Sequence, residues 1–129
     1  MKTVVRKQFE VGIVCSISLL LLFSSPANAL DVKTYEELKR TSLSKEVLKS
    51  FILGLGEGYS WSNTFLKKRG DRNLYCAPNI VLNAENHINI IDSQISFLKK
   101  SNTPLQTIME TPVEILLYIG LVDSFPCSK

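Results

Sequence analysis

The chain has few of the residues that catalytic and metal sites use most. Its 129 residues contain one histidine, His87, one tryptophan and three cysteines. One histidine with two distant cysteines makes a poor ligand set for zinc, and a nucleophile–base pair would need the fold to bring a hydroxyl to His87. His87 lies beside the apolar positions of a predicted helix, where a structural role is expected. We therefore expect a protein that is not an enzyme and has no catalytic residue, cofactor or metal ion.

The chain also lacks a strong excess of charge. It has 15 Lys and Arg against 12 Asp and Glu, and because residues 1–29 hold three of the first group and one of the second, the remainder carries 12 against 11. A domain so close to neutrality gives no reason to expect nucleic acid or a membrane as partner. The basic cluster at 67–69 suits the last turn of a helix, and binding of an acidic protein surface is its alternative interpretation.

Only one long apolar run is present, and it lies at the start of the chain. The run from 11 to 23 follows a basic segment and precedes Ala27-Asn28-Ala29, which has the small residues of a cleavage site. An uncleaved membrane anchor is the alternative, but the run is shorter than the roughly 20 residues that span a bilayer, and Pro26 follows it. We expect residues 1–29 to be an export signal cleaved after Ala29, and residues 30–129 to form one domain.

The three cysteines divide between these two parts. Cys15 lies inside the apolar run and is expected to leave with the signal, whereas Cys76 and Cys127 remain. Free thiols or a metal pair are the alternatives, but an exported protein meets an oxidising compartment. A Cys76–Cys127 disulfide would close a loop of about 50 residues and contribute roughly 4 kcal/mol in the chain-entropy model.

The apolar residues of the remaining chain recur at helical spacing, with no sustained strand alternation and no internal repeat. The predicted fold is all-α, a small irregular bundle of four to five helices with one disulfide. A short first helix is predicted to begin at Thr34, with a capping box to Glu37, and to end near 40–42. A second is predicted from Ser44 to Gly70, with Leu43 and Leu48 as a hydrophobic staple.

The second predicted helix has an apolar stripe and three glycines. The stripe follows the i, i+3, i+4 pattern, is expected to be buried in the core, and comprises Val47, Leu48, Phe51, Ile52, Leu55 and Tyr59. Glycine costs roughly 1 kcal/mol relative to alanine inside a helix, so Gly54, Gly56 and Gly58 need a reason. A nucleotide-binding loop is excluded because no strand precedes them. We expect Gly54 and Gly58, one turn apart, to allow close packing of another helix.

The third predicted helix is capped by Asn83 and ends before Pro104, and its seam comprises Ala84, Ile88, Ile91, Ile95 and Leu98. Residues 101–110 read as a loop with exposed apolar residues, which either folds back onto the core or meets a partner. The last helix is predicted to start with Thr111 as cap, Pro112 at its first position and Glu114 closing a capping box. Because its apolar residues lie nearly all round, we expect it to be the most buried helix.

Several of these motifs together resemble a known family. A helix with Gly-x-Gly-x-Gly-Tyr at 54–59 is followed by a connector with Leu-Tyr-Cys-Ala-Pro at 74–78. An amphipathic helix, a Pro-containing turn and a final apolar helix ending in Phe125-Pro126-Cys127 follow. Over residues 44–128 this order resembles the Tai-type family of periplasmic immunity proteins, which protect bacteria against peptidoglycan amidase toxins delivered by type VI secretion.

The resemblance implies more than the residues alone do. It implies a periplasmic location, an all-helical fold related to small acid chaperones, a disulfide between the matching cysteines and a homodimer. It also implies inhibition of a cognate amidase by a loop that enters the catalytic cleft. Residues 101–110 could supply this loop, with Leu105, Gln106, Thr107, Ile108 and Met109 as the partner-binding residues. A second interpretation stays open: an exported helical binding module without a toxin, chaperone-like or an envelope adaptor.

Overall fold

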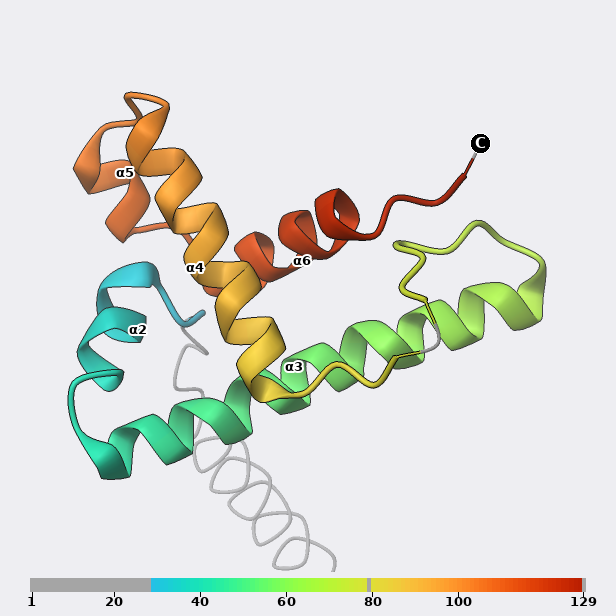
Figure 1. The fold of residues 1–129 in the computed structure, drawn as a ribbon, viewed down its shortest axis with the longest axis horizontal. Helices are drawn as coiled ribbons and strands as arrows, with labels where there is room; N and C mark the ends of the chain where they lie inside the picture. The colour runs from blue at the N-terminus through green and yellow to red at the C-terminus, as the bar shows by residue number, and fades with distance from the viewer. Residues whose placement is uncertain (1–28, 79, 129) are drawn as a thin grey trace, which may run out of the picture.

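The structure is a computed structural model that describes residues 29–78 and 80–128. In these ranges the chain forms five helices and no strand, which confirms the predicted all-α class (Figure 1). The helices are α2 (Val32–Leu38), α3 (Ser42–Arg69), α4 (Ala84–Lys100), α5 (Leu105–Met109) and α6 (Val113–Ser124). Of the predicted signal peptide, residues 1–28 lie outside the described residues.

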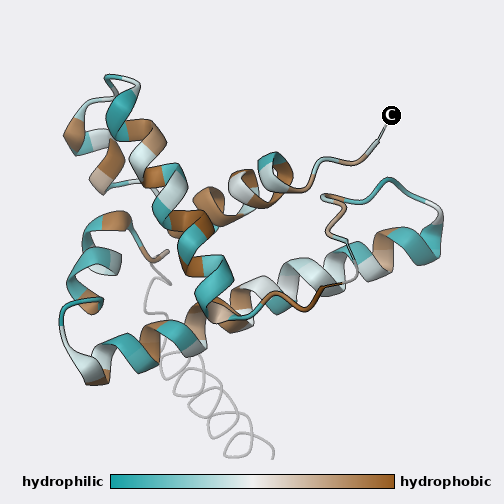
Figure 2. Cartoon of the chain, in the orientation of Figure 1, coloured by the Kyte–Doolittle hydropathy of each residue, from teal (hydrophilic) through white to brown (hydrophobic). Residues whose placement is uncertain are grey.

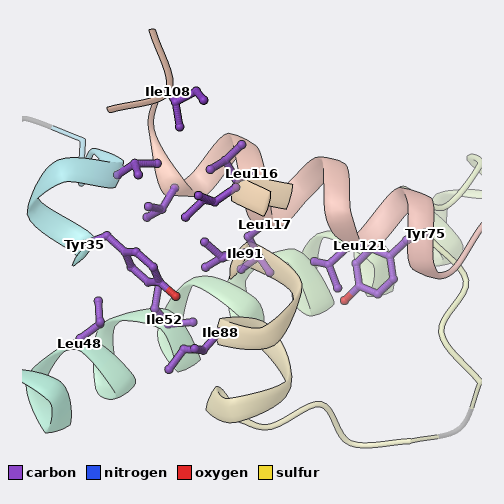
Figure 3. Close-up of a cluster of buried hydrophobic side chains, with 13 residues drawn as sticks. Tyr35, Leu48, Ile52, Tyr75, Ile88, Ile91, Ile108, Leu116, Leu117 and Leu121 are labelled. Carbon is purple, nitrogen blue, oxygen red and sulfur yellow. The ribbon is translucent and has the colours of Figure 1, made fainter. Parts of the chain in front are cut away.

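The core forms where α4 crosses the other helices. The helix α4 packs against α6 and against α3, while α2 lies beside the start of α3 and α5 packs against α2 and α4 beside the end of α4 (Figure 1). Figure 3 shows Ile91 of α4 between Leu117 of α6 and Ile52 of α3. The buried apolar side chains are Val32, Tyr35, Leu48, Ile52, Tyr75, Ile88, Ile91, Ile95, Ile108, Val113, Leu116, Leu117 and Leu121.

The first two helices begin earlier than predicted. Asp31, not Thr34, caps α2, because its carboxylate accepts the Thr34 N–H at 2.8 Å. Thr41, not Ser44, caps α3, and its hydroxyl accepts the Ser44 N–H at 3.3 Å. The predicted staple is wrong, since Leu43 is 80% exposed. In each case two suitable capping residues, acidic or hydroxyl, stand three positions apart, so the sequence alone did not decide between them.

The far end of α3 and both ends of α4 agree with prediction. Gly70 takes the left-handed conformation, with φ 77°, and ends α3. Asn83 caps α4 in a reciprocal capping box with Asn86. Within the predicted seam of α4, Ile88, Ile91 and Ile95 are buried, while Ala84 and Leu98 are partly buried. Tyr35 of α2 donates a hydrogen bond to Asp92 of α4, and Lys39, which follows α2, forms an ion pair with the same carboxylate at 2.8 Å.

The start of α6 is not the predicted capping box. Pro112, rather than Thr111, is the capping residue, and no side chain caps the helix. Instead, the Val113 N–H donates to the Leu30 carbonyl at 2.8 Å, and the Glu114 carboxylate accepts from the Leu30 N–H at 3.2 Å. The first described segment of the chain therefore satisfies backbone groups at the start of α6. The helix α6 is also less buried than predicted, because Ile115 is 50% exposed.

Two glycines permit the close helix crossings, and neither is one of those predicted. A Cβ at Gly56 of α3 would collide with Cε1 of His87 on α4, and a Cβ at Gly120 of α6 would collide with Cγ2 of Ile90. Gly54 and Gly58 have open space where a Cβ would stand, so the expectation that they pack against another helix of this chain is wrong. Gly56 points toward α4 because it lies about 160° around the helix from either of them.

The disulfide predicted between Cys76 and Cys127 is present, with Cα atoms 4.9 Å apart. It joins the connector after α3 to the end of the chain. The Cys76 N–H also donates to the Phe125 carbonyl at 2.7 Å, so the two segments meet through backbone as well as sulfur. Asn63 of α3 fixes the other side of the connector: its amide accepts from the Leu74 N–H at 2.7 Å and donates to the Tyr75 carbonyl at 2.9 Å.

Candidate functional site: two exposed surfaces and a buried histidine

The segment expected to meet a partner is a turn and a short helix, not an open loop. Ser101 ends α4, Asn102 has φ 58°, and Pro104 begins α5. The Ser101 hydroxyl bonds to the Leu98 carbonyl at 2.9 Å and lies 3.0 Å from the Thr103 hydroxyl, so the turn is held by its own side chains. We call residues 101–107, the turn and the first three residues of α5, the tip.

The five predicted partner-binding residues divide into two groups. Leu105 is 62% exposed, and Gln106 and Thr107 are also exposed. Ile108 is only 1% exposed, and Met109 is partly buried against the core. The prediction that these residues are exposed to a partner is therefore wrong for Ile108, and only part of the Met109 side chain is exposed. The segment thus folds back onto the core at Ile108, as one of the two alternatives expected, and is exposed at Leu105. Contact with a partner, the other alternative, stays a prediction.

Buried and exposed halves of the segment are linked by local hydrogen bonds. The Thr111 hydroxyl, expected to cap α6, donates to the Thr107 carbonyl at 2.7 Å. The Gln106 amide of α5 donates to the carboxylate of Glu110, the residue that follows α5. Together with the burial of Ile108 in the core, these contacts attach the tip to the end of the bundle that lies beside the end of α4 (Figure 1).

A second exposed surface runs along α3. Val47, Trp61 and Phe65 are each about 60% exposed, and Phe51 is 45% exposed. They share one face with Gly54 and Gly58, because the six positions follow spacings of four and three. We call Val47, Phe51, Gly54, Gly58, Trp61 and Phe65 the α3 stripe. The sequence prediction placed Val47 and Phe51 in the core, but the helix face toward α4 and α6 is instead formed by Leu48, Ile52, Leu55, Gly56 and Tyr59.

Hydrophobic residues of α3 occur as separate brown bands between teal and white ones, whereas α6 is brown where it crosses α4 (Figure 2). This matches a helix that is apolar on more than one face. Trp61 and Phe65 have ring centroids 6.5 Å apart, so the aromatic end of the α3 stripe is itself packed. Exposed aromatic side chains at helical spacing are typical of a protein-binding surface.

His87 is the buried polar side chain of the core, with 2% exposure. Its ring lies against Gly56, and its Nδ1 atom is buried without a hydrogen-bond partner among the described residues. Burial lowers the pKa of His87, and the nearby Glu57 partly opposes that change. The structure therefore favours a structural role for His87, with an imidazole that is neutral at pH 7 and does not donate a proton in a reaction.

A cavity of about 610 Å³ lies beside His87, between α3 and the connector. Its lining includes Ser60, Asn63, Thr64 and Lys67 of α3 and Tyr75 of the connector. Asn63 is already occupied by the connector backbone. The other polar groups of the lining are the hydroxyls and the side chains of Glu57, Lys67, Asn73 and His87, which do not define a particular ligand.

The described part of the chain contains no group of three or more His, Cys, Asp or Glu side chains that could hold a metal ion. None of the helices described is both long and apolar enough to cross a bilayer. Comparisons with protein-family models, with curated proteins and with solved structures found no match for this chain.

Proposed function

We propose that this chain is an exported protein that acts by binding another protein, and that its partner is a peptidoglycan amidase toxin delivered by type VI secretion. The observation that carries the proposal is the tip, where exposed Leu105, Gln106 and Thr107 are followed directly by Ile108 in the core. The resemblance to periplasmic immunity proteins supplies the class of partner. The tip would enter the catalytic cleft of the amidase and exclude its substrate.

The tip has the physical features that an inhibitory segment needs. A segment that is ordered before binding loses less conformational entropy when it binds. Here the order comes from buried Ile108, from the Thr111–Thr107 hydrogen bond and from the packing of α5 against α4 and α2. Leu105 supplies an exposed apolar contact, and Gln106 and Thr107 supply hydrogen-bonding groups for the rim.

A substitution in the tip tests this role. Leu105→Asp places a charge where an apolar contact is proposed, so we expect capture and inhibition of the amidase to weaken by at least tenfold with little change in melting temperature. Leu43→Asp is the matched control, because Leu43 is also an exposed leucine but stands at the start of α3. Equal inhibition by Leu105→Asp and the unmodified protein would contradict the role of the tip.

We also propose that the α3 stripe binds a second copy of the chain. Its positions are symmetric about residue 56: 47 and 65 are equally far from it, as are 51 and 61, and 54 and 58. When two antiparallel copies of α3 pair about a twofold axis at residue 56, Val47 meets Phe65, Phe51 meets Trp61, and Gly54 meets Gly58. A twofold interface requires this self-complementarity, since the same surface patch serves both copies.

The glycines and the ends of the stripe support this arrangement. Gly54 and Gly58 have open space at their Cβ positions, so at the axis two helix backbones can approach closely. The next positions in the same spacing, Ser44 and Lys68, are polar and again symmetric about residue 56. The stripe spans about 27 Å of helix axis. Together with the polar residues on either side of the stripe, this length suits an interface that buries about 800 Å² of surface on each copy.

Sedimentation velocity with one pair of variants tests the dimer. Trp61→Glu should convert a dimer to a monomer because it buries a charge at the interface. Leu53→Glu, on α3 outside the stripe, should leave the dimer intact. A spin label on Lys68→Cys should give a distance of about 36 Å between copies in the antiparallel register. A monomeric unmodified protein, or a much shorter distance, would contradict the arrangement.

The exposed α3 stripe also favours a second candidate function. An exported helical module that binds a non-toxin partner, as a chaperone or an envelope adaptor, would use the same apolar surface without the tip. In that case Trp61→Glu abolishes partner binding and Leu105→Asp does not. The two variants therefore separate the candidates in one pull-down experiment.

A further inference from the structure

The backbone just after the predicted cleavage point is held against α6. The Leu30 N–H lies 3.2 Å from Oε1 of Glu114, and the Leu30 carbonyl accepts from the Val113 N–H at 2.8 Å. Val32 continues the pairing through its N–H, which donates to the Thr111 carbonyl at 3.1 Å. Ala29 is exposed while Leu30 is partly buried. The Ala29–Leu30 peptide bond therefore stands where the chain passes from solvent to its place on α6.

Only one of the two carboxylate oxygens of Glu114 has a partner in this contact. Oε1 accepts from Leu30, but Oε2 is buried and has no hydrogen-bond partner among the described residues. The Tyr59 hydroxyl, which is close by, donates to the backbone carbonyl of Glu114 and not to its carboxylate. A buried carboxylate oxygen without a donor is costly, so its position needs an explanation.

We propose that Glu114 is the binding partner of the α-ammonium group that signal cleavage creates at Leu30. Hydrolysis of the Ala29–Leu30 bond by a leader peptidase consumes one water and leaves a carboxylate on Ala29 and an ammonium on Leu30. The peptide nitrogen of Leu30 has one N–H, whereas the ammonium has three and a positive charge. It can donate to both oxygens of Glu114, and such charge-assisted hydrogen bonds are stronger than neutral ones.

Cleavage would thus complete the contact between the first segment of the processed chain and α6. The segment from Leu30 to Val32 pairs with 111–113, and Val32 and Val113 are both fully buried. An ion pair at its end fixes this segment where it would otherwise fray. The processed protein should therefore be more stable than the same protein without the free ammonium. The inference depends on the proposed export, and the mass of the exported protein tests that step separately.

The test uses the protein exported from its natural full-length chain. Intact mass should show a chain that begins at Leu30. Acetylation at pH 7, which favours the α-amine over the lysines, then removes the positive charge. We expect acetylation to lower the melting temperature of the unmodified protein by roughly 4 to 8 °C. In Glu114→Gln the same acetylation should change it little, because the charged partner is already absent. Glu110→Gln, with an exposed carboxylate, is the matched control and should behave like the unmodified protein.

The α-amine should also react several-fold more slowly in the unmodified protein than in Glu114→Gln. If Glu114→Gln does not accumulate, the unmodified protein in native buffer and in urea gives the comparison, and the α-amine should be protected only in the folded state. A different first residue would contradict the inference. An effect of acetylation on the melting temperature that is absent, or that is equal in the unmodified protein and in Glu114→Gln, would also contradict it. The same holds for an α-amine that reacts as fast in the folded state as in urea.

Discussion

At the scale of single residues, two buried polar side chains, His87 and Tyr35, show how burial changes the chemistry of a group. His87 is the clearest case, since it is 2% exposed, lies against Gly56 and has no hydrogen-bond partner for Nδ1 among the described residues. Tyr35 is the opposite case, because its buried hydroxyl donates to Asp92 at 2.8 Å. Burial and this hydrogen bond raise the pKa of Tyr35, so its hydroxyl remains a donor over the whole physiological range.

The lowered pKa of His87 predicts a pH dependence of stability. The folded state holds the neutral imidazole, so the unfolded state binds more protons once the pH falls below its ordinary pKa of about 6.5. The free energy of unfolding should therefore fall as the pH is lowered from 7.5 through 6.5 and toward the folded-state pKa. Thermal melting of the unmodified protein and of His87→Met across this range is the measurement. An unchanged slope in His87→Met would show that another group is responsible.

At the scale of elements, the two glycine crossings determine how α4 packs. Gly56 and Gly58 are two residues apart on the same helix, yet a Cβ would collide with His87 at the first and meet open space at the second. The all-α fold could be predicted without distinguishing Gly56 from Gly58. The close crossing of α3 and α4, however, depends on a glycine at 56.

Alanine substitutions at these two glycines should have opposite effects. Gly56→Ala should lower the free energy of unfolding by about 1 to 3 kcal/mol, because the new methyl group overpacks the His87 contact. Gly58→Ala should raise it by up to about 1 kcal/mol through helix propensity, measured at a concentration where the chain is monomeric. Urea denaturation gives both values. A destabilisation of equal size at both positions would contradict the assigned contact.

The sequence predicted helices better than their contacts. Gly70 and Asn83 are strong local signals, so the end of α3 and the start of α4 could be read directly. The start of α6 could not, because its backbone is satisfied by Leu30, which lies more than 80 residues away. The choice of Gly56 over Gly54 and Gly58 was also hidden, since it depends on which face meets His87.

The candidate site was predictable only in part for the same reason. The segment 105–109 was singled out by three apolar residues in a predicted loop, Leu105, Ile108 and Met109. A five-residue pattern does not show that Ile108 points into the core and Leu105 into solvent. The connector is fixed at two points, and only one of them could be predicted. The two cysteines indicated the disulfide clearly. Asn63, which holds the connector backbone by two hydrogen bonds, could not be distinguished in the sequence from any other polar residue of an exposed helix.

At the scale of the whole molecule, one disulfide ties the end of the chain to its middle. Cys76 and Cys127 are 51 residues apart in sequence, so the bond removes many conformations from the unfolded state. Cys127→Ser should lower the free energy of unfolding by about 2 to 5 kcal/mol. Urea denaturation with and without reductant measures this, and reductant should have no further effect on the double variant Cys76→Ser, Cys127→Ser. Equal stability of oxidised and reduced protein would contradict the contribution of the bond.

The proposed dimer and the proposed inhibition use different parts of the molecule. The α3 stripe would join two copies, while the tip lies at the end of α4 and includes the start of α5 (Figure 1). Each copy could then bind one amidase without disturbing the pairing. This separation means that Trp61→Glu should lose dimerisation and keep inhibition, whereas Leu105→Asp should do the reverse.

The most direct test of the proposed function is a titration of peptidoglycan cleavage. Type VI amidase toxins from the strain of origin and its close relatives would be assayed with increasing amounts of the exported, oxidised protein. We predict that one of them loses all cleavage at a ratio of one chain per toxin, and that Leu105→Asp fails to inhibit it. Full cleavage by every amidase in the presence of excess protein would contradict the proposal that this chain is an amidase inhibitor.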